Sequence, residues 1–226
     1  MRRLARITAK GAAAVALVIL LLSVLLNVIN PPVTTLMVWR GIQGQERQWE
    51  WRRLGDISPH LVAAVVAAED SRFCDHWGID WTQVQKVLAR AGAQGEPPAR
   101  GASTISMQVA KNLFLWPSRS IIRKALELPL ALWLDLVLSK RRVLEIYLNI
   151  AEWAPGVYGA DAASRHHFDR RADRLTRRQA ALLAATLPAP FRRNPSAPNG
   201  TLSRLAGVYQ KRMEAIGPYI GCLGVR

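Results

Sequence analysis

The chain has 226 residues, half of them apolar, and a formal net charge of +15. That length is enough for one well-buried domain with an appendage. The two cysteines, Cys74 and Cys222, are too few for a disulfide-rich scaffold or a cysteine-based metal site, and the sequence leaves open whether they pair. The positive charge makes nucleic acid, anionic lipid and phosphorylated substrates the candidate partners.

An uncharged apolar run covers residues 11–29 and is long enough to cross a bilayer as a helix. A cleaved signal peptide is the alternative, but its apolar core is shorter and ends at a small-x-small site. This run ends in Asn30-Pro31-Pro32 instead, which favours an uncleaved anchor. We therefore expect a cytoplasmic tail over 1–10 and a transmembrane helix over 11–30.

The residues before this run contain four basic side chains and no acidic one. The positive-inside rule then places the N-terminus in the cytoplasm and the remainder on the outer side of the membrane. A nucleic-acid role is excluded on this basis, because the partner would lie in the other compartment. The basic residues are Arg2, Arg3, Arg6 and Lys10.

Residues 31–53 are expected to form a juxtamembrane linker, because Pro31 and Pro32 stop the preceding helix. The linker alternates Trp39, Trp49 and Trp51 with arginines. This pattern fits an interfacial collar at the membrane, and it equally fits a strand leading into the fold. Residues 54–226 are expected to form the folded domain.

The domain is predicted to be mainly α, with no convincing succession of strands. Residues 125–138 are apolar around the whole helix, which predicts a central buried helix, and 92–101 is rich in Gly and Pro, which predicts a loop. The expected helices are His60–Asp70, Trp81–Ala91, Ala125–Leu138, Lys140–Asn149, Ala160–Phe168, Leu175–Leu187 and Leu202–Ile216.

Glu69 and Asp70 lie at the end of a nearly all-apolar helix, where the helix dipole disfavours negative charge. One explanation is an ion pair with Arg72 or a nearby lysine. The other is a catalytic carboxylate whose pKa is raised by its apolar surroundings. His76 follows closely and is interpreted as a hydrogen-bonded structural histidine, since no spaced Cys/His set accompanies it.

Gln108, Lys111 and Asn112 recur at spacings of three and four, so they share one helical face. Two amides and a cation suit an anionic, oxygen-rich ligand, although a solvated helix surface has the same pattern. Ser103 is the expected cap of this helix. The apolar residues 113–116 that follow either belong to the core or form an exposed patch that docks on lipid.

A basic cluster comes next, with Glu127 one helical turn after Arg123. Glu127 is either half of an ordinary i, i+4 ion pair or a second functional carboxylate among cations. The cations are Arg119, Arg123 and Lys124.

These residues resemble the glycosyltransferase domain of bacterial peptidoglycan polymerases, the lysozyme-like family that links lipid II units. With one anchor and no transpeptidase domain, the chain is similar to the monofunctional members. The resemblance covers roughly 54–195 and implies a two-lobed, lysozyme-like fold. It rests on five ordered blocks, Glu69–Gly78, Gly101–Asn112, Arg123–Glu127, Lys140–Asn149 and Gly156–Phe168.

The resemblance implies that Glu69 is the general base that deprotonates the 4-hydroxyl of lipid II, and that Glu127 is the second, donor-side glutamate. It implies no required cofactor; a divalent cation at the diphosphate is compatible with it, although no dedicated cage is evident. It implies diphosphate binding by Lys111, Arg119, Arg123 and Lys124, sugar or phosphate positioning by Gln108, Ser103, Thr104 and Asn112, and support from Asp70, Phe73, His76 and Lys140.

The sequence departs from the family pattern at three positions. Met107 replaces the first of two consecutive glutamines, so any contact of that amide is in doubt. His167 stands where an aromatic residue is usual, and Pro129 is unexpected after the third block.

The implied partners are lipid II, the nascent glycan chain and the inner membrane, with cell-division or wall-synthesis proteins as further candidates. A lysozyme-like lytic transglycosylase is the alternative enzyme, but it needs no diphosphate site. A non-catalytic scaffold of the division machinery is the second alternative.

Overall fold

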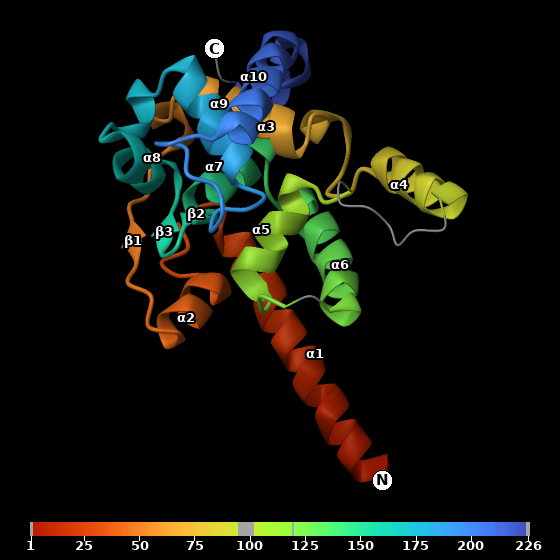
Figure 1. Ribbon diagram of the computed structural model, residues 1–226. Coiled ribbons are helices and arrows are strands. Elements are labelled where there is room, and N and C mark those ends of the chain that lie inside the picture. Colours follow the sequence, from red (N-terminus) through yellow and green to blue (C-terminus); the bar gives the residue numbers. More distant parts are fainter. Residues whose placement is uncertain (1, 95–101, 119, 225–226) are drawn as a thin grey trace.

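The computed structural model describes residues 2–94, 102–118 and 120–224. Its body is almost entirely helical, as predicted, and one long helix, α1 (Arg2–Leu25), projects from it (Figure 1). Helices α3, α9 and α10 lie at the end of the body away from α1, whereas α2, α5 and α6 lie at the near end. The site described below lies between these two groups.

The first group is built around α3 (Pro59–Glu69), whose side chains Leu61, Val62 and Val65 are completely buried. It packs against α9 (Arg177–Thr186) and α10 (Gly200–Ala215). Helix α9 begins after its N-cap residue Thr176, which forms a capping box with Gln179. This packing makes α3 a rigid element and so fixes the position of Glu69 in its last turn.

The second group includes α5 (Ile105–Phe114) and α6 (Ile121–Val137), and α4 (Trp81–Gln94) comes before them in the chain. Helix α5 packs against α6 and also against α7 (Lys140–Ile150). Helix α4 continues past the predicted end at residue 91. The remainder of the predicted loop, 95–101, lies outside the described residues.

Helix α6 differs from the prediction of a fully buried helix. Its inward face carries Ala131 and Leu134, which are completely buried, whereas Leu136 is 67 % exposed. Ile121 and Ile122 are 89 % and 70 % exposed. The apolar residues do circle the helix, but the protein covers only one side of it.

A small sheet was missed by the sequence analysis. Strands β1 (Gln48–Trp49), β2 (Glu152–Ala154) and β3 (Val157–Tyr158) pair in the order β1-β3-β2, with β1 parallel to β3. Two or three residues are too few to show an alternating pattern. Strand β1 fits the strand alternative for the linker, and α2 (Thr35–Ile42) precedes it. Helix α8 (Ala160–Phe168) follows β3 as predicted.

The foot of α1 is attached to the body. Trp133 Nε1 donates a 2.6 Å hydrogen bond to Ser23 Oγ, and Asn27 Nδ2 donates to the Val137 carbonyl at 2.9 Å. Within the described residues, none of the helices combines the length and the apolar character that crossing a bilayer requires. The predicted membrane span therefore stays a prediction.

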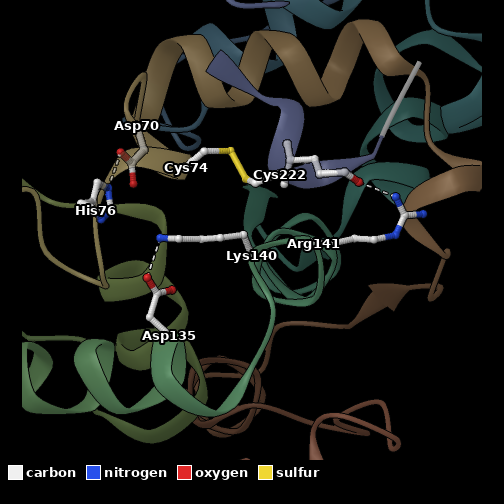
Figure 2. Close-up of a disulfide and its surroundings, with 8 residues drawn as sticks. Asp70, Cys74, His76, Asp135, Lys140, Arg141 and Cys222 are labelled. Carbon is white, nitrogen blue, oxygen red and sulfur yellow. Dashed lines mark hydrogen bonds and ion pairs between the residues drawn. A yellow bond between two sulfur atoms is a disulfide. The ribbon is translucent and has the colours of Figure 1, made fainter. Parts of the chain in front are cut away.

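Cys74 and Cys222 form a disulfide with a Cα–Cα distance of 5.9 Å (Figure 2). Cys74 belongs to the short 3₁₀ helix Phe73–Asp75, which follows Glu69 closely, and Cys222 to the 3₁₀ helix Gly221–Leu223 at the C-terminal end. Arg141 Nη1 donates to the Leu223 carbonyl at 2.6 Å and fixes the same segment to α7.

Candidate active site

Glu69 is the last residue of α3 and is half-buried. Gln108 Nε2, from α5, donates a 2.7 Å hydrogen bond to Glu69 Oε2. Tyr147 OH, from α7, donates to Gln108 Oε1 at 3.1 Å and so fixes which end of the amide faces the carboxylate. Burial raises the pKa of Glu69, and the Gln108 hydrogen bond and the charge of Lys111 partly offset this rise. A carboxylate with this balance is suited to accept a proton near neutral pH.

Asp70 and His76 hold the chain beside Glu69. His76 Nε2 and Asp70 Oδ1 are 2.9 Å apart (Figure 2). The Ile105 backbone N–H donates to Asp70 Oδ2 at 3.0 Å. Asp70 therefore joins the end of α3 to the start of α5. The Arg72 ion pair considered for Glu69 and Asp70 goes to Asp75 and Asp80 instead.

A buried carboxylate on α6, Asp135, connects this loop to the rest of the site. It accepts hydrogen bonds from the Gly78 backbone N–H and from Ser106 Oγ at 2.8 Å, and Lys140 Nζ lies 2.5 Å from it. Gly78 has φ +68, and a Cβ there would lie 2.5 Å from the Ala131 carbonyl oxygen, so the loop crosses directly over α6. The crossing sets the position of α6 relative to the Glu69 loop.

Glu127 is buried, with 3 % of its side chain exposed, and lies on the face of α6 nearest this loop. Lys124 Nζ lies 2.7 Å from Glu127 Oε2 and donates a 2.8 Å hydrogen bond to Ser103 Oγ. Arg123 also contacts the Glu127 carboxylate. Both explanations of Glu127 therefore apply: it pairs with Arg123, and it lies within a cluster of cations.

The cations of this cluster repel one another. The pKa of Lys111 is lowered by burial and by the charge of Arg123, while the charge of Glu69 opposes this. Burial, with the charges of Arg123 and Lys111, lowers the pKa of Lys124 to about 8, and the ion pair with Glu127 opposes this change. Like charges held this close without a full set of counter-charges form a site for an anion. The two glutamates thus face one shared group of cations.

Two cavities adjoin Glu69 and this group. The first has a volume of about 560 Å³ and is lined by Glu69, Arg72, Ser103 and the C-terminal residues Arg212 and Tyr219, among others. The second, of about 400 Å³, is lined by Gln108, Lys111, Asn112 and Arg123 together with residues of α2. The predicted shared face of α5 thus opens into a cavity rather than into bulk solvent.

Comparison with known proteins agrees with this geometry. A family model described as Transglycosylase matches residues 36–214. The chain belongs to the transglycosylase family. Its relatives include proteins named "Biosynthetic peptidoglycan transglycosylase" from Brucella suis biovar 1 (55 % identity over 85 % of each chain) and from Nitrobacter winogradskyi (51 % identity, 95 % of this chain and 94 % of the relative). A protein of the same name from Agrobacterium fabrum is 53 % identical over 85 % of this chain and 84 % of its own.

Several residues singled out in the sequence have structural contacts in this transglycosylase. Thr104, rather than Ser103, caps α5, and its hydroxyl donates to the Gly78 carbonyl at 2.6 Å. Phe73 is completely buried beneath the Lys140 ammonium, which lies 4.5 Å from the ring centroid. Leu113 and Leu115 are buried and belong to the core, whereas Trp116 is exposed. Arg119 lies outside the described residues.

None of the three departures from the family pattern replaces a carboxylate of the site. Met107 is 2 % exposed, so its side chain does not reach either cavity. Burial and the neighbouring His166 lower the pKa of His167 to about 4. Pro129 is accommodated within α6. No three side chains of His, Cys, Asp or Glu gather as metal ligands anywhere in the described part of this transglycosylase.

The sequence analysis missed three polar residues of the site. Asp135 and Tyr147 act through the hydrogen bonds described above. Glu152 is buried beside the second cavity, where Arg40 Nε of α2 donates to it at 3.3 Å. Burial raises the pKa of Glu152. Asp135 is the one acidic residue in the otherwise apolar stretch 128–138, and this was a signal available in the sequence.

Proposed function

We propose that this transglycosylase polymerises lipid II in bacterial cell-wall synthesis, with Glu69 as the general base. The Glu69 carboxylate takes the proton of the glucosamine 4-hydroxyl of lipid II. The resulting oxygen nucleophile bonds to the anomeric carbon of the lipid-linked glycan, and the bond from that carbon to the diphosphate breaks. Attack from the face opposite the diphosphate inverts the anomeric centre. The raised pKa of Glu69 supports the role of base.

The leaving diphosphate needs positive charge as the bond breaks. Lys111, Arg123 and Lys124 supply it, and bidentate guanidinium contacts suit phosphate oxygens. Glu127 acts on the donor side by orienting Arg123 and Lys124, both of which contact its carboxylate. The observation that carries the proposal is the cluster of cations Lys111, Arg123 and Lys124 beside Glu69, whose carboxylate accepts the hydrogen bond from Gln108.

A lytic transglycosylase would cut the same polymer with a similar glutamate. It has no diphosphate to neutralise, so it would gain nothing from mutually repelling cations beside Glu69. Burial lowers the pKa values of Lys111 and Lys124, and the charges of neighbouring cations lower them further. This feature favours the polymerase over the hydrolase.

A divalent cation would compete with these cationic side chains for the same diphosphate. Glu127 is already in contact with Arg123 and Lys124, so it is a poor metal ligand. We therefore assign charge neutralisation to the side chains and derive no step through a metal.

We further propose that the protein is anchored in the inner membrane with its catalytic domain in the periplasm. The uncharged run at 11–29, preceded only by basic residues, supports an anchor. The exposed side chains Ile121, Ile122 and Leu136 of α6, the helix that contacts the foot of α1, would rest on the same lipid surface. A substrate with a polyprenyl tail would then reach the site without leaving the bilayer.

The deciding experiment is incubation of the purified full-length protein with labelled lipid II. We expect β-linked polymer and, for Glu69→Gln, a loss of about 10³–10⁴-fold in turnover. A residual rate within tenfold of wild type would remove Glu69 from the role of base. Shortened glycan from purified sacculi would favour the hydrolase, and unimpaired function of Glu69→Gln in cells would favour the scaffold.

A further inference from the structure

The cavity of about 560 Å³ beside Glu69 has a wall that the catalytic mechanism does not use. This wall is the C-terminal segment, residues 216–224, which contributes Ile216 and Tyr219. Arg212 and Ala215, just before the segment, extend the same wall. All of the segment lies beyond residue 214, where the match to the family model ends.

The C-terminal segment is fixed firmly at both ends. Ile216 is 6 % exposed and Leu223 is completely buried, and Arg141 binds the Leu223 carbonyl. The Cys74–Cys222 disulfide ties the segment to the loop that follows Glu69 (Figure 2). Its position relative to the carboxylate is therefore set by a covalent bond as well as by packing.

Between these fixed ends, Tyr219 is 54 % exposed and lines the cavity. The fold therefore uses both ends of the segment for packing and leaves this aromatic ring on the cavity wall. Arg72, Asp80 and Gln83 supply polar groups to the same cavity. An aromatic face with polar groups around it suits a pyranose ring, which has an apolar C–H face and polar substituents at its edge.

We propose that Tyr219 is a substrate-binding residue that stacks on an N-acetylated pyranose ring in this cavity, held in position by the Cys74–Cys222 disulfide. The inference rests on the proposed function, which supplies the sugar. The ring belongs either to the growing glycan or to the incoming lipid II. Both offer the same chemistry, and kinetics with each substrate varied in turn distinguishes them.

The test uses preformed lipid-linked glycan as donor and lipid II as acceptor, with wild type, Tyr219→Ala and Tyr219→Phe. We expect Tyr219→Ala to raise KM for one of the two substrates by about three- to tenfold, because one aromatic contact is lost. The value of kcat should stay within twofold of wild type. Tyr219→Phe should retain the wild-type KM because it keeps the ring. A raised donor KM with shorter product chains assigns the growing glycan, and a raised acceptor KM assigns lipid II. Unchanged KM values for both substrates in Tyr219→Ala overturn the proposal.

A binding measurement separates this inference from the proposed function. Tri-N-acetylchitotriose should give saturation-transfer NMR signals with wild type that are lost with Tyr219→Ala. If wild type binds this sugar through Tyr219 but makes no polymer, the proposed function fails while the contact between Tyr219 and the sugar stands. If wild type makes polymer and Tyr219→Ala changes neither sugar binding nor KM, only the inference fails.

Cys222→Ser tests the role of the disulfide. We expect it to raise the same KM as Tyr219→Ala, and the double variant to show no further increase, because both changes remove one contact. Circular dichroism checks that the variant is folded. Reduction of the wild type with dithiothreitol provides a second route to the same state. A folded, reduced protein with unchanged KM would show that packing alone positions Tyr219.

Discussion

The side-chain amide of Gln108 donates a 2.7 Å hydrogen bond to the carboxylate of Glu69. This contact lowers the pKa of a group whose burial raises it. The Tyr147 hydroxyl holds the other end of the amide, so three helices, α3, α5 and α7, together set the basicity of one carboxylate. Gln108 is thus a positioning residue whose removal should alter a pH profile as well as a rate.

We expect Gln108→Leu to lower kcat at pH 7 by about 10- to 100-fold, within the range for disturbing a general base. Loss of the hydrogen bond removes an influence that lowers the pKa of Glu69, so that pKa rises and less of the base is ionised at a given pH. The ascending limb of the kcat profile should therefore move to higher pH. Steady-state polymerisation of lipid II from pH 5 to 9 measures both effects.

Gln85→Leu is the matched control, because Gln85 is exposed on α4 and the chemical change is the same. It should leave the rate and the profile unchanged. An unshifted ascending limb in Gln108→Leu would mean that the Glu69 pKa does not depend on this hydrogen bond.

Lys124 should limit activity at high pH. Its pKa is lowered to about 8 by burial, Arg123 and Lys111, and the Glu127 ion pair opposes that change. If its charge is needed at the diphosphate, kcat should fall as the pH rises through a midpoint at or above 8. Lys124→Arg keeps the charge, so the descending limb should move to higher pH.

Lys86→Arg is the control for this change, since Lys86 is exposed on α4. Its profile should overlay that of wild type. A descending limb at the same pH in wild type and Lys124→Arg would assign the limb to another group.

The disulfide should stabilise the folded domain in addition to positioning the C-terminal segment. It joins residues 148 positions apart, and cross-links of long loops contribute about 2–5 kcal/mol to the free energy of unfolding. Reduction should lower that free energy by this amount in urea titrations. Cys74→Ser with Cys222→Ser should show the lower stability with or without reductant. Equal stability of oxidised and reduced wild type would contradict the expectation.

Helices with strong local signals were predictable from the sequence. The helices at α3, α7, α8 and α9 were all predicted within two residues of their observed bounds. The sheet was not predictable, because its strands are short and β1 pairs with a segment more than a hundred residues away. The outward face of α6 was missed because apolar periodicity does not distinguish a buried face from an exposed apolar one.

The site was predictable in its composition but not in its connections. The spacing of Gln108 and Lys111 predicted a shared face, yet it could not show that the amide reaches Glu69 while Tyr147 holds it. Likewise, Lys140 was expected to support the site, but its carboxylate partner Asp135 depends on how α6 and α7 pack. Hydrogen bonds between distant helices are set by tertiary packing and leave no local pattern.

The exposed start of α6 should matter only when lipid II lies in a bilayer. Ile121→Asp with Ile122→Asp removes two side chains that are 89 % and 70 % exposed. Acidic residues in the first turn suit the helix dipole, so folding should be unaffected. We expect the rate of lipid II polymerisation in liposomes to fall by about tenfold or more, because two isoleucine side chains can no longer be buried in the bilayer. The rate in detergent should stay within twofold of wild type.

Val208→Asp on α10 is the control, because Val208 is also exposed, and it should change neither rate. Equal losses in liposomes and in detergent would mean that this end of α6 serves the fold or the site, and not the membrane.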